Sequence, residues 1–402
     1  KWTRIALVKR ILVGLILGAI LGIAVPQATG IAILGDVFVS ALKAIAPLLV
    51  FFLVISSLCN AGKSHGGVIK TVIILYMFST VLAAVIAVFA SMAFPVKMTL
   101  ANAATDTSAP QGIVEVLNNL LLNVVANPVS SLVNANYVGI LMWAVLLGLA
   151  FRVADKMTKK VLADVADGIS MVVTWIINLA PFGIFGLVFN TVSTNGLDIF
   201  TTYGKLLLLL VGCMLFIYFV TNPLLVYWCI RQNPYPLIFQ CLKRSALTAF
   251  FTRSSAANIP VNMKVCEEMG LDRDTYSVTI PLGATINMDG AAITITVMTM
   301  ATAFTLGIHV DIPTAIILSL LAALSACGAS GVAGGSLLLI PMACSLFGIS
   351  DDISMQVVAV GFIIGVVQDS VETALNSSSD LLLSASAEFR QWRLEGKEIK
   401  FK

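Results

Sequence analysis

Four polar residues near the end of the chain, Asp369, Thr373, Asn376 and Asp380, interrupt a strongly apolar sequence. They are spaced i, i+4, i+7 and i+11, so a helix turning about 100° per residue places them in one narrow stripe. Glu372 lies about 60° to one side of that stripe. Carboxylate, amide and hydroxyl oxygens together can bind a hard cation or an amino group. The spacing therefore indicates a polar binding site on one helical face.

The helix that carries this stripe belongs to a membrane protein. Of 402 residues, 58% are hydrophobic and 11% are charged, and the mean hydropathy is +0.98. The charged share is about half that of a soluble domain. Several stretches approach the roughly 20 apolar residues that a membrane-spanning helix needs. This composition predicts an all-α polytopic membrane protein with spans over residues 11–25, 37–58, 68–94, 137–151, 169–192, 206–230, 275–305 and 357–383.

The carboxylates of the stripe need partners at membrane depth. A charged side chain at the bilayer centre costs about 2.5 to 3.5 kcal/mol on insertion scales. The stripe itself contains no Lys or Arg. The countercharge must come from another segment, from protons, from bound cations or from an amine-bearing substrate.

The distribution of basic residues predicts the orientation of the chain. Eight spans place both termini on one side, and cytoplasmic loops carry an excess of Lys and Arg. All but four of the 24 Lys and Arg residues fall at the termini or in loops assigned to that side; the exceptions are Lys43, Lys97, Lys205 and Arg253. Both termini are therefore predicted to be cytoplasmic. The net charge of +3 reflects this topology and indicates no nucleic-acid partner.

Two further regions are too irregular to be simple spans. Apolar sequence is cut by FFTRSSAANIP at residues 250–260 and by SACGASGVAGGS at residues 325–336. Flanks of about 10 to 14 apolar residues favour re-entrant hairpins. A polar-studded span follows each hairpin, which is consistent with an inverted repeat and is typical of transporter binding sites. Two ordinary loops between spans are the alternative interpretation.

The first of the two polar-studded spans contains INMDG, with Asn287, Asp289 and Gly290 in mid-segment. These residue types favour a locally unwound helix. Unwinding frees carbonyl oxygens, which suit a hard cation beside a carboxylate. No G-x-x-x-x-G-K-[ST] motif for a nucleotide occurs, so the chain encodes no ATP-driven pump. An intramembrane protease is disfavoured because Ser and Asp are abundant enough to pair by chance, whereas an anion channel or a sensor stays open.

Four motifs in order, TRSSAANIP, PLGATINMDG, CGASGVAGG and D-x-x-x-T-x-x-N-x-x-x-D, resemble the signatures of the dicarboxylate/amino acid:cation symporter family. The resemblance extends from KRILVGLILGAILG near the start to the last span. The sequences of the motifs are most similar to those of bacterial sodium-coupled carriers of serine and threonine. It implies a non-enzymatic transporter in the lipid of a bacterial inner (plasma) membrane. It further implies eight transmembrane helices, two opposed re-entrant hairpins, inverted repeats and a homotrimer.

The resemblance also implies that two parts of the chain have different roles, one as a fixed scaffold and one as a moving transport part. A scaffold of residues 1–65 and 113–200, with spans 1, 2, 4 and 5, would hold the subunits together. A transport part of residues 66–95 and 203–388 would move as an elevator. It would contain spans 3 and 6, hairpin 1 at about 235–268, span 7 at about 275–307, hairpin 2 at about 312–349 and span 8 at about 351–388.

Carried over residue by residue, the resemblance implies a site for an amino acid. Asp369 would bind its amino group, and Asn376 would bind its carboxylate together with Ser254 and Ser255, with Thr373 beside them. Hairpin 2 would close as the outer gate. The remaining residues expected at the substrate are Arg253, Ala291, Val332, Ser336 and Glu372.

The same resemblance implies Na⁺ as the coupling ion, at three sites. The first would use Asp380 with carbonyls of Gly283, Asn287 and Asn376; the second Asp289 and Asn287 with Tyr76, Ser79 and Thr80; and the third Thr285, Met288, Ala326, Cys327 and Ala329. The third site departs most from the family, because Ala326 and Ala329 replace hydroxyl residues.

Two departures indicate the substrate. Carriers of acidic substrates in the family place an arginine where this chain has Glu372, and arginine is suited to gripping a carboxylate with two hydrogen bonds. Ala291 likewise replaces a threonine. A glutamate would repel an acidic side chain and could accept a hydrogen bond from a hydroxyl. We therefore expect sodium-coupled import of small neutral amino acids, most of all L-serine and L-threonine, with a proton-coupled neutral carrier or a sodium-coupled acidic carrier as alternatives.

Overall fold

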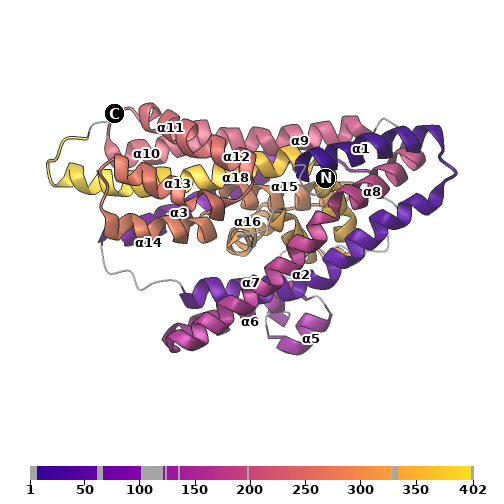
Figure 1. The fold of residues 1–402 in the computed structure, drawn as a ribbon, viewed down its shortest axis with the longest axis horizontal. Helices are drawn as coiled ribbons and strands as arrows, with labels where there is room; N and C mark the ends of the chain where they lie inside the picture. Colours follow the sequence, from indigo (N-terminus) through magenta and orange to yellow (C-terminus); the bar gives the residue numbers. More distant parts are fainter. Residues whose placement is uncertain are drawn as a thin grey trace.

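A computed structural model describes residues 7–60, 67–100, 121–122, 125–134, 136–196, 199–327, 329 and 334–399. Every regular element in these ranges is helical (Figure 1). The first half of the chain forms α1 (Leu7–Ala24), η2 (Thr29–Ala32), α2 (Ile33–Asn60), α3 (Gly67–Ala93), α5 (Pro128–Val133), α6 (Tyr137–Ala150), η3 (Phe151–Val153), α7 (Lys156–Asn178) and α8 (Ala180–Asn195).

The second half contains the elements around the predicted site. They are α9 (Ile199–Phe216), η4 (Ile217–Thr221), α10 (Asn222–Ile230), α11 (Tyr235–Cys241), η5 (Leu242–Ala246), α12 (Leu247–Thr252), α13 (Ser255–Glu268), α14 (Arg273–Ile286), α15 (Asp289–Thr305), α16 (Ile312–Ala326), η6 (Gly335–Leu339), α17 (Ile340–Ser345) and α18 (Asp351–Leu394).

Helix length agrees with a polytopic membrane protein. Within the described ranges, six helical segments are long and apolar enough to cross a membrane: Thr29–Asn60, Gly67–Ala93, Lys156–Asn178, Phe200–Ile230, Arg273–Thr305 and Asp351–Leu394. The predicted all-α polytopic class is therefore confirmed.

The predicted single span over 169–192 is wrong. The chain forms two helices there, because α7 ends at Asn178 and α8 begins at Ala180. Pro181 lies in the first turn of α8, where a backbone N–H has no partner within the helix, so the missing N–H of proline breaks no hydrogen bond. A preceding helix cannot continue through a proline without losing a hydrogen bond and clashing with its ring. The first of the two helices also starts earlier than expected, at Lys156, because the Asp155 side chain accepts a hydrogen bond from the backbone N–H of Thr158 at 2.7 Å and caps it.

Helices α1 and α8 pack with unusually close backbones. Gly14, Gly18 and Gly22 follow one another every four residues along α1, and a Cβ added to Gly14 would lie 2.2 Å from the carbonyl oxygen of Pro181. Glycines at this spacing let two membrane helices approach closely. Helix α2 contacts α6, α7 and α8, and α2, α6 and α7 lie together along the lower side of Figure 1.

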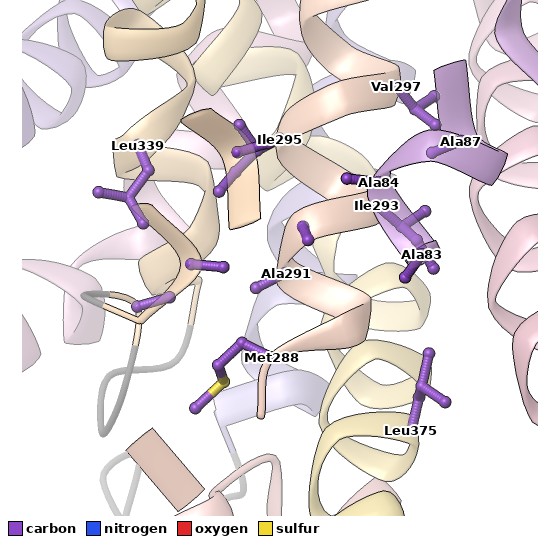
Figure 2. Packing of buried hydrophobic residues seen from close by; sticks show 14 of the residues in the cluster. Ala83, Ala84, Ala87, Met288, Ala291, Ile293, Ile295, Val297, Leu339 and Leu375 are labelled. Carbon is purple, nitrogen blue, oxygen red and sulfur yellow. The ribbon is translucent and has the colours of Figure 1, made fainter. Parts of the chain in front are cut away.

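Helix α18 is the central element of the other half of the chain. It contacts α3 and most elements from α9 to α17, and its yellow C-terminal part extends to the left side of Figure 1. Helix α15 packs against both α18 and α3. Figure 2 shows the small side chains Ala83, Ala84 and Ala87 of α3 beside Ile293 and Val297 of α15. Small residues at this contact bring α3 close enough for its hydroxyl side chains to reach the start of α15.

Both irregular regions pack back on themselves. In the first, helix α12 ends where Arg253 adopts a left-handed conformation with φ of 51°, and α13 then packs against η5 and α12. Asn258 and Asn262 of α13 donate hydrogen bonds to the side chain and backbone of Ser377 in α18, at 2.8 Å each. In the second, α16 contacts η6 and α17. We call these regions the first hairpin (residues 235–268) and the second hairpin (residues 312–345).

The helix break predicted at INMDG is present. Helix α14 ends at Ile286, Asn287 and Met288 leave the helical conformation, and α15 starts at Asp289. The break positions two side chains, Asn287 and Asp289, against α18 and α3.

Candidate functional site

The stripe on α18 is buried inside the helix bundle. Asp369, Thr373, Asn376 and Asp380 are all at most 6% exposed. Asn376 uses its side-chain oxygen to accept a hydrogen bond from the backbone N–H of Gly290 at 2.7 Å. The stripe therefore faces the helix break and the two hairpins.

The countercharge for Asp369 comes from another segment. The Arg253 Nε lies 2.9 Å from Oδ2 of Asp369, and the side chains of both residues are at most 10% exposed. The second hairpin contacts the same carboxylate, because the backbone N–H of Gly334 donates to Oδ1 at 3.2 Å. Asp369 therefore joins both hairpins to α18. An amino group that binds Asp369 must share it with Arg253.

Glu372 lies in a network of neutral donors. Its Oε2 accepts hydrogen bonds from Thr294 Oγ1 at 2.7 Å, from Ser336 Oγ at 2.9 Å and from the amide of Gln368. The residue is 5% exposed. Gly290 packs directly on it, since an added Cβ would lie 2.9 Å from the Cα of Glu372. Glu372 is thus a buried carboxyl group held by three neutral donors.

Asp380 and Asn287 form the first candidate cation cluster. Asn287 Nδ2 donates to Asp380 Oδ1 at 2.9 Å and to Ser379 Oγ at 2.8 Å. Its own Oδ1 is buried with no hydrogen-bond partner among the described residues. Gly283 is packed so closely that an added Cβ would lie 2.7 Å from Asp380 Oδ1. The cluster thus contains a carboxylate beside an unpaired amide oxygen.

Asp289 forms the second candidate cation cluster. It is fully buried and accepts hydrogen bonds from Ser79 at 2.7 Å and from Thr80 at 3.1 Å. The hydroxyl and the backbone carbonyl of Tyr76 lie at different clusters. Its hydroxyl donates to the backbone oxygen of Asp380 at 2.9 Å, whereas its own carbonyl lies 2.9 Å from the Thr80 hydroxyl, whose single proton can go to this carbonyl or to Asp289. Only the carbonyl of Tyr76, and not its hydroxyl, lies on the Asp289 side.

The residues expected at a third cation site come from the end of α14 and from the second hairpin. The thiol of Cys327 lies 3.9 Å from the backbone oxygen of Ile286, which brings these two ends together. Ala326, Ala329 and Met288 are buried, and the Thr285 hydroxyl donates to the carbonyl of Leu282 at 2.7 Å. Apart from the Thr285 hydroxyl, the oxygen atoms that these residues offer to a cation are backbone carbonyls.

Within the described residues, the serines of the first hairpin make no hydrogen bond to the stripe. Ser254 caps α13 by accepting a hydrogen bond from the N–H of Ala257 at 3.2 Å, and Ser255 is the first residue of that helix. Within the described ranges no hydrogen bond joins either serine to Asn376 or Thr373. Ala291 is fully buried on α15, next to Gly290. Val332 lies outside the described residues.

Several side chains of the site were not expected from the sequence. They are Gln368 and Thr294 beside Glu372, Ser379 beside Asn287, and Asn222, whose Oδ1 lies 3.5 Å from the Ser79 hydroxyl. Gln368 could have been found, because it precedes Glu372 by four residues and so shares its helical face. Asn222 carries no such signal, since it reaches the site from a distant segment.

Buried acidic residues at a helix break between two helical hairpins, in a polytopic bundle, define the class of protein: a secondary membrane transporter. Residues 7–388 match the model of the Sodium:dicarboxylate symporter family, and the chain belongs to this family.

Curated relatives cover nearly the whole chain. A protein of Bifidobacterium adolescentis named Serine/threonine transporter SstT is 58% identical over 395 residues, 98% of this chain and 92% of the relative. Proteins with the same name from Streptococcus thermophilus and Streptococcus agalactiae are 56% identical over 393 residues and 58% over 388. These alignments cover 98% of both chains for the former and 96% of both for the latter. The prediction of a transporter rather than an enzyme is confirmed.

Proposed function

We propose that this protein imports L-serine, L-threonine and other small neutral amino acids together with sodium. The observation that carries the substrate assignment is Glu372, a buried carboxylate held by three neutral donors inside the candidate site. Arg253 is already paired with Asp369. An acidic side chain would meet negative charge here, whereas a hydroxyl could donate to it. The name shared by the curated relatives supports the same substrates.

In this proposal the stripe binds the backbone of the amino acid. The ammonium group binds Asp369 and shares it with Arg253, and the carboxylate binds Asn376 and the tip of the first hairpin at Ser254 and Ser255, beside Thr373. Ala291 and Glu372 face the side chain of the substrate. Val332 and Ser336 belong to the second hairpin, which closes over the site.

Sodium fits the two acidic clusters as a co-transported substrate. Hard cations prefer oxygen ligands, and Asn287 Oδ1 is a buried oxygen that lacks a partner among the described residues. One ion would bind Asp380 with oxygens of Gly283, Asn287 and Asn376. A second would bind Asp289 with Ser79, Thr80 and the carbonyl of Tyr76. A third would use carbonyl oxygens between Thr285, Met288 and the Ala326–Ala329 segment.

Coupling follows from the charge of these clusters. Asp289 and Asp380 have no basic partner in the described structure, so a bound cation removes an uncompensated buried charge. The second hairpin can then close over a neutralised cavity, because sodium and the amino acid both favour the closed form. Each positive charge moved inward gains about 2.3 kcal/mol per 100 mV of membrane potential.

We also propose the family architecture for the parts of the chain that carry this site. The protein would have eight transmembrane helices with two opposed re-entrant hairpins, assemble as a homotrimer in a bacterial inner membrane, and keep both termini in the cytoplasm. Residues 1–65 and 113–200 would form the scaffold, and residues 66–95 and 203–388 the moving transport part. Packing of α2 with α6, α7 and α8, and of α18 with α3 and most elements from α9 to α17, supports this division.

Uptake of radiolabelled serine into proteoliposomes, with sodium and proton gradients imposed separately, tests the proposal. We expect uptake that requires inward sodium, that alanine and threonine inhibit, and that aspartate does not. Uptake driven by a pH gradient without sodium would establish the proton-coupled alternative. Inhibition by aspartate would establish the acidic carrier, and the absence of uptake under either gradient would favour a channel or a sensor.

A further inference from the structure

Four side chains from three elements form one hydrogen-bonded group around Glu372. Gln368 and Glu372 lie one turn apart on α18, Thr294 comes from α15, and Ser336 comes from η6 in the second hairpin. All four are at most 5% exposed. Such a network, shielded from water, holds its members in one arrangement more strongly than the separate bonds would.

The three donors converge on a single oxygen of Glu372. Thr294, Ser336 and Gln368 all donate to Oε2, and within the described part of the chain no hydrogen bond reaches Oε1. A carboxylate offers about four acceptor positions, shared between its two oxygens. Oε2 is therefore saturated, and Oε1 is the oxygen that can accept a further donor.

Gln368 is the member that fixes this arrangement. Its amide nitrogen donates to both Glu372 Oε2 and Thr294 Oγ1, the latter at 2.8 Å, so its two N–H groups are both used. Because the Thr294 oxygen accepts one of these N–H groups, the Thr294 hydroxyl donates its own proton to Glu372. Gln368 and Thr294 thus fix the rotation of the Glu372 carboxylate about its Cγ–Cδ bond.

Ser336 connects the same carboxylate to the second hairpin. Its hydroxyl donates to Glu372 Oε2 at 2.9 Å, and two residues earlier the N–H of Gly334 donates to Asp369 Oδ1 at 3.2 Å. The hairpin is therefore held to α18 at two acids, one assigned above to the ammonium group of the substrate and one to its side chain.

We propose that Gln368 and Thr294 are positioning residues for side-chain recognition: they hold Oε2 of Glu372 so that Oε1 accepts the hydroxyl of serine or threonine, while Ser336 ties closure of the second hairpin to the same carboxylate. This inference rests on the proposed function. Alanine lacks the hydroxyl of serine. The preference for serine over alanine would therefore depend on Gln368 and Thr294 as well as on the groups that touch the substrate.

The test compares serine and alanine uptake by proteoliposomes containing Gln368→Met or Thr294→Val. Both substitutions keep side-chain size and remove the donors. Loss of a hydrogen bond to a charged group predicts that KM for serine rises about tenfold or more, while KM for alanine changes less than about twofold. Thr294→Ser, which keeps the hydroxyl, restores the preference for serine.

Matched controls come from the same two helices. Thr302 is fully buried on α15 and donates to the carbonyl of Met298, and Gln391 lies on α18 and bonds Glu395. Thr302→Val and Gln391→Met are expected to leave the ratio of the two KM values unchanged. A rise in KM that is equal for serine and alanine in the Gln368 and Thr294 variants would overturn the inference. Failure of the unaltered protein to take up serine would instead overturn the proposed function, and the inference with it.

The role of Ser336 has its own readout. Cys327, at the second hairpin, is the only one of the seven cysteines that is not buried, so a small thiol reagent reports on this hairpin. With sodium present in both arms, we expect serine to slow labelling of Cys327 in the unaltered protein, and Ser336→Ala to remove about half or more of that protection. Cys327→Ala identifies the labelled site. Equal protection in the Ser336→Ala variant would show that Ser336 has no part in closure.

Discussion

The guanidinium group of Arg253 lies 2.9 Å from the carboxylate of Asp369, Nε to Oδ2, and joins the turn of the first hairpin to the middle of α18. The sequence left four possible sources for the countercharge of Asp369, and this contact identifies a neighbouring segment as the source. It also gives the site a different charge balance with and without substrate. In the proposed function the ammonium group of the substrate shares Asp369 with Arg253, whereas in the empty site Arg253 alone neutralises it.

Replacing Arg253 is expected to separate net uptake from exchange. In Arg253→Ala the empty carrier would hold Asp369 as a buried, unpaired charge, and breaking a buried pair costs about 3 to 5 kcal/mol. Net serine uptake, which needs the empty carrier to return, should fall at least tenfold. Serine–serine exchange in preloaded proteoliposomes needs only the loaded carrier and should change about twofold or less.

The matched control for this prediction is the ion pair of Arg244 with Glu268 on the same hairpin, which is more than one third exposed. Exposed pairs contribute little, so Arg244→Ala should leave both assays within about twofold of the unaltered protein. Equal losses of uptake and exchange in Arg253→Ala would show that Arg253 acts on substrate binding itself.

Removing the charge of Asp289 is expected to weaken sodium coupling. Asp289→Asn keeps the size of the side chain but removes the carboxylate to which Ser79 and Thr80 donate. A loss of about 1.4 kcal/mol corresponds to tenfold weaker binding. The sodium concentration for half-maximal serine uptake should therefore rise about tenfold or more. Asp155→Asn serves as the control, because Asn caps a helix as well as Asp does, and it should not shift the sodium curve.

Glu372→Ala is expected to change substrate preference rather than abolish transport. Loss of the carboxylate removes the acceptor for a substrate hydroxyl, so serine uptake should fall about tenfold and alanine uptake much less. Competition between labelled serine and unlabelled alanine measures the change directly. An equal loss of both activities would argue that Glu372 has a general role in packing or gating.

Close packing of α1 on α8 is expected to tolerate no side chain at Gly18. A Cβ there would lie 2.6 Å from the carbonyl oxygen of Phe185, a backbone atom that cannot rotate away. Overpacking of this kind costs about 1 to 3 kcal/mol. Gly18→Ala should therefore lower the unfolding temperature in detergent, by several degrees. Gly204→Ala in α9, where no atom lies within 4 Å of the added Cβ, should leave it unchanged or raise it slightly.

Local patterns were sufficient for the features that depend on neighbouring residues in the chain. The polytopic helical class follows from apolar length, because a helix must bury its own backbone polar groups in lipid. The stripe on α18 follows from helical periodicity, and the break at Asn287 and Met288 follows from the residue types around it. The break at Leu179 was missed because the apolar sequence continues through it, although Pro181 lies in the first turn of a new helix.

By itself, then, the sequence determined that this is a helical membrane protein, and it determined where acids interrupt its apolar segments. Only the tertiary structure decided which groups neutralise and orient those acids: Arg253 for Asp369, Ser79 and Thr80 for Asp289, and Gln368, Thr294 and Ser336 for Glu372. All but one of these partners come from other helices or from a hairpin. Periodicity relates only residues on the same helix, whereas a buried charge is stabilised by whatever the packing of helices brings within about 3 Å.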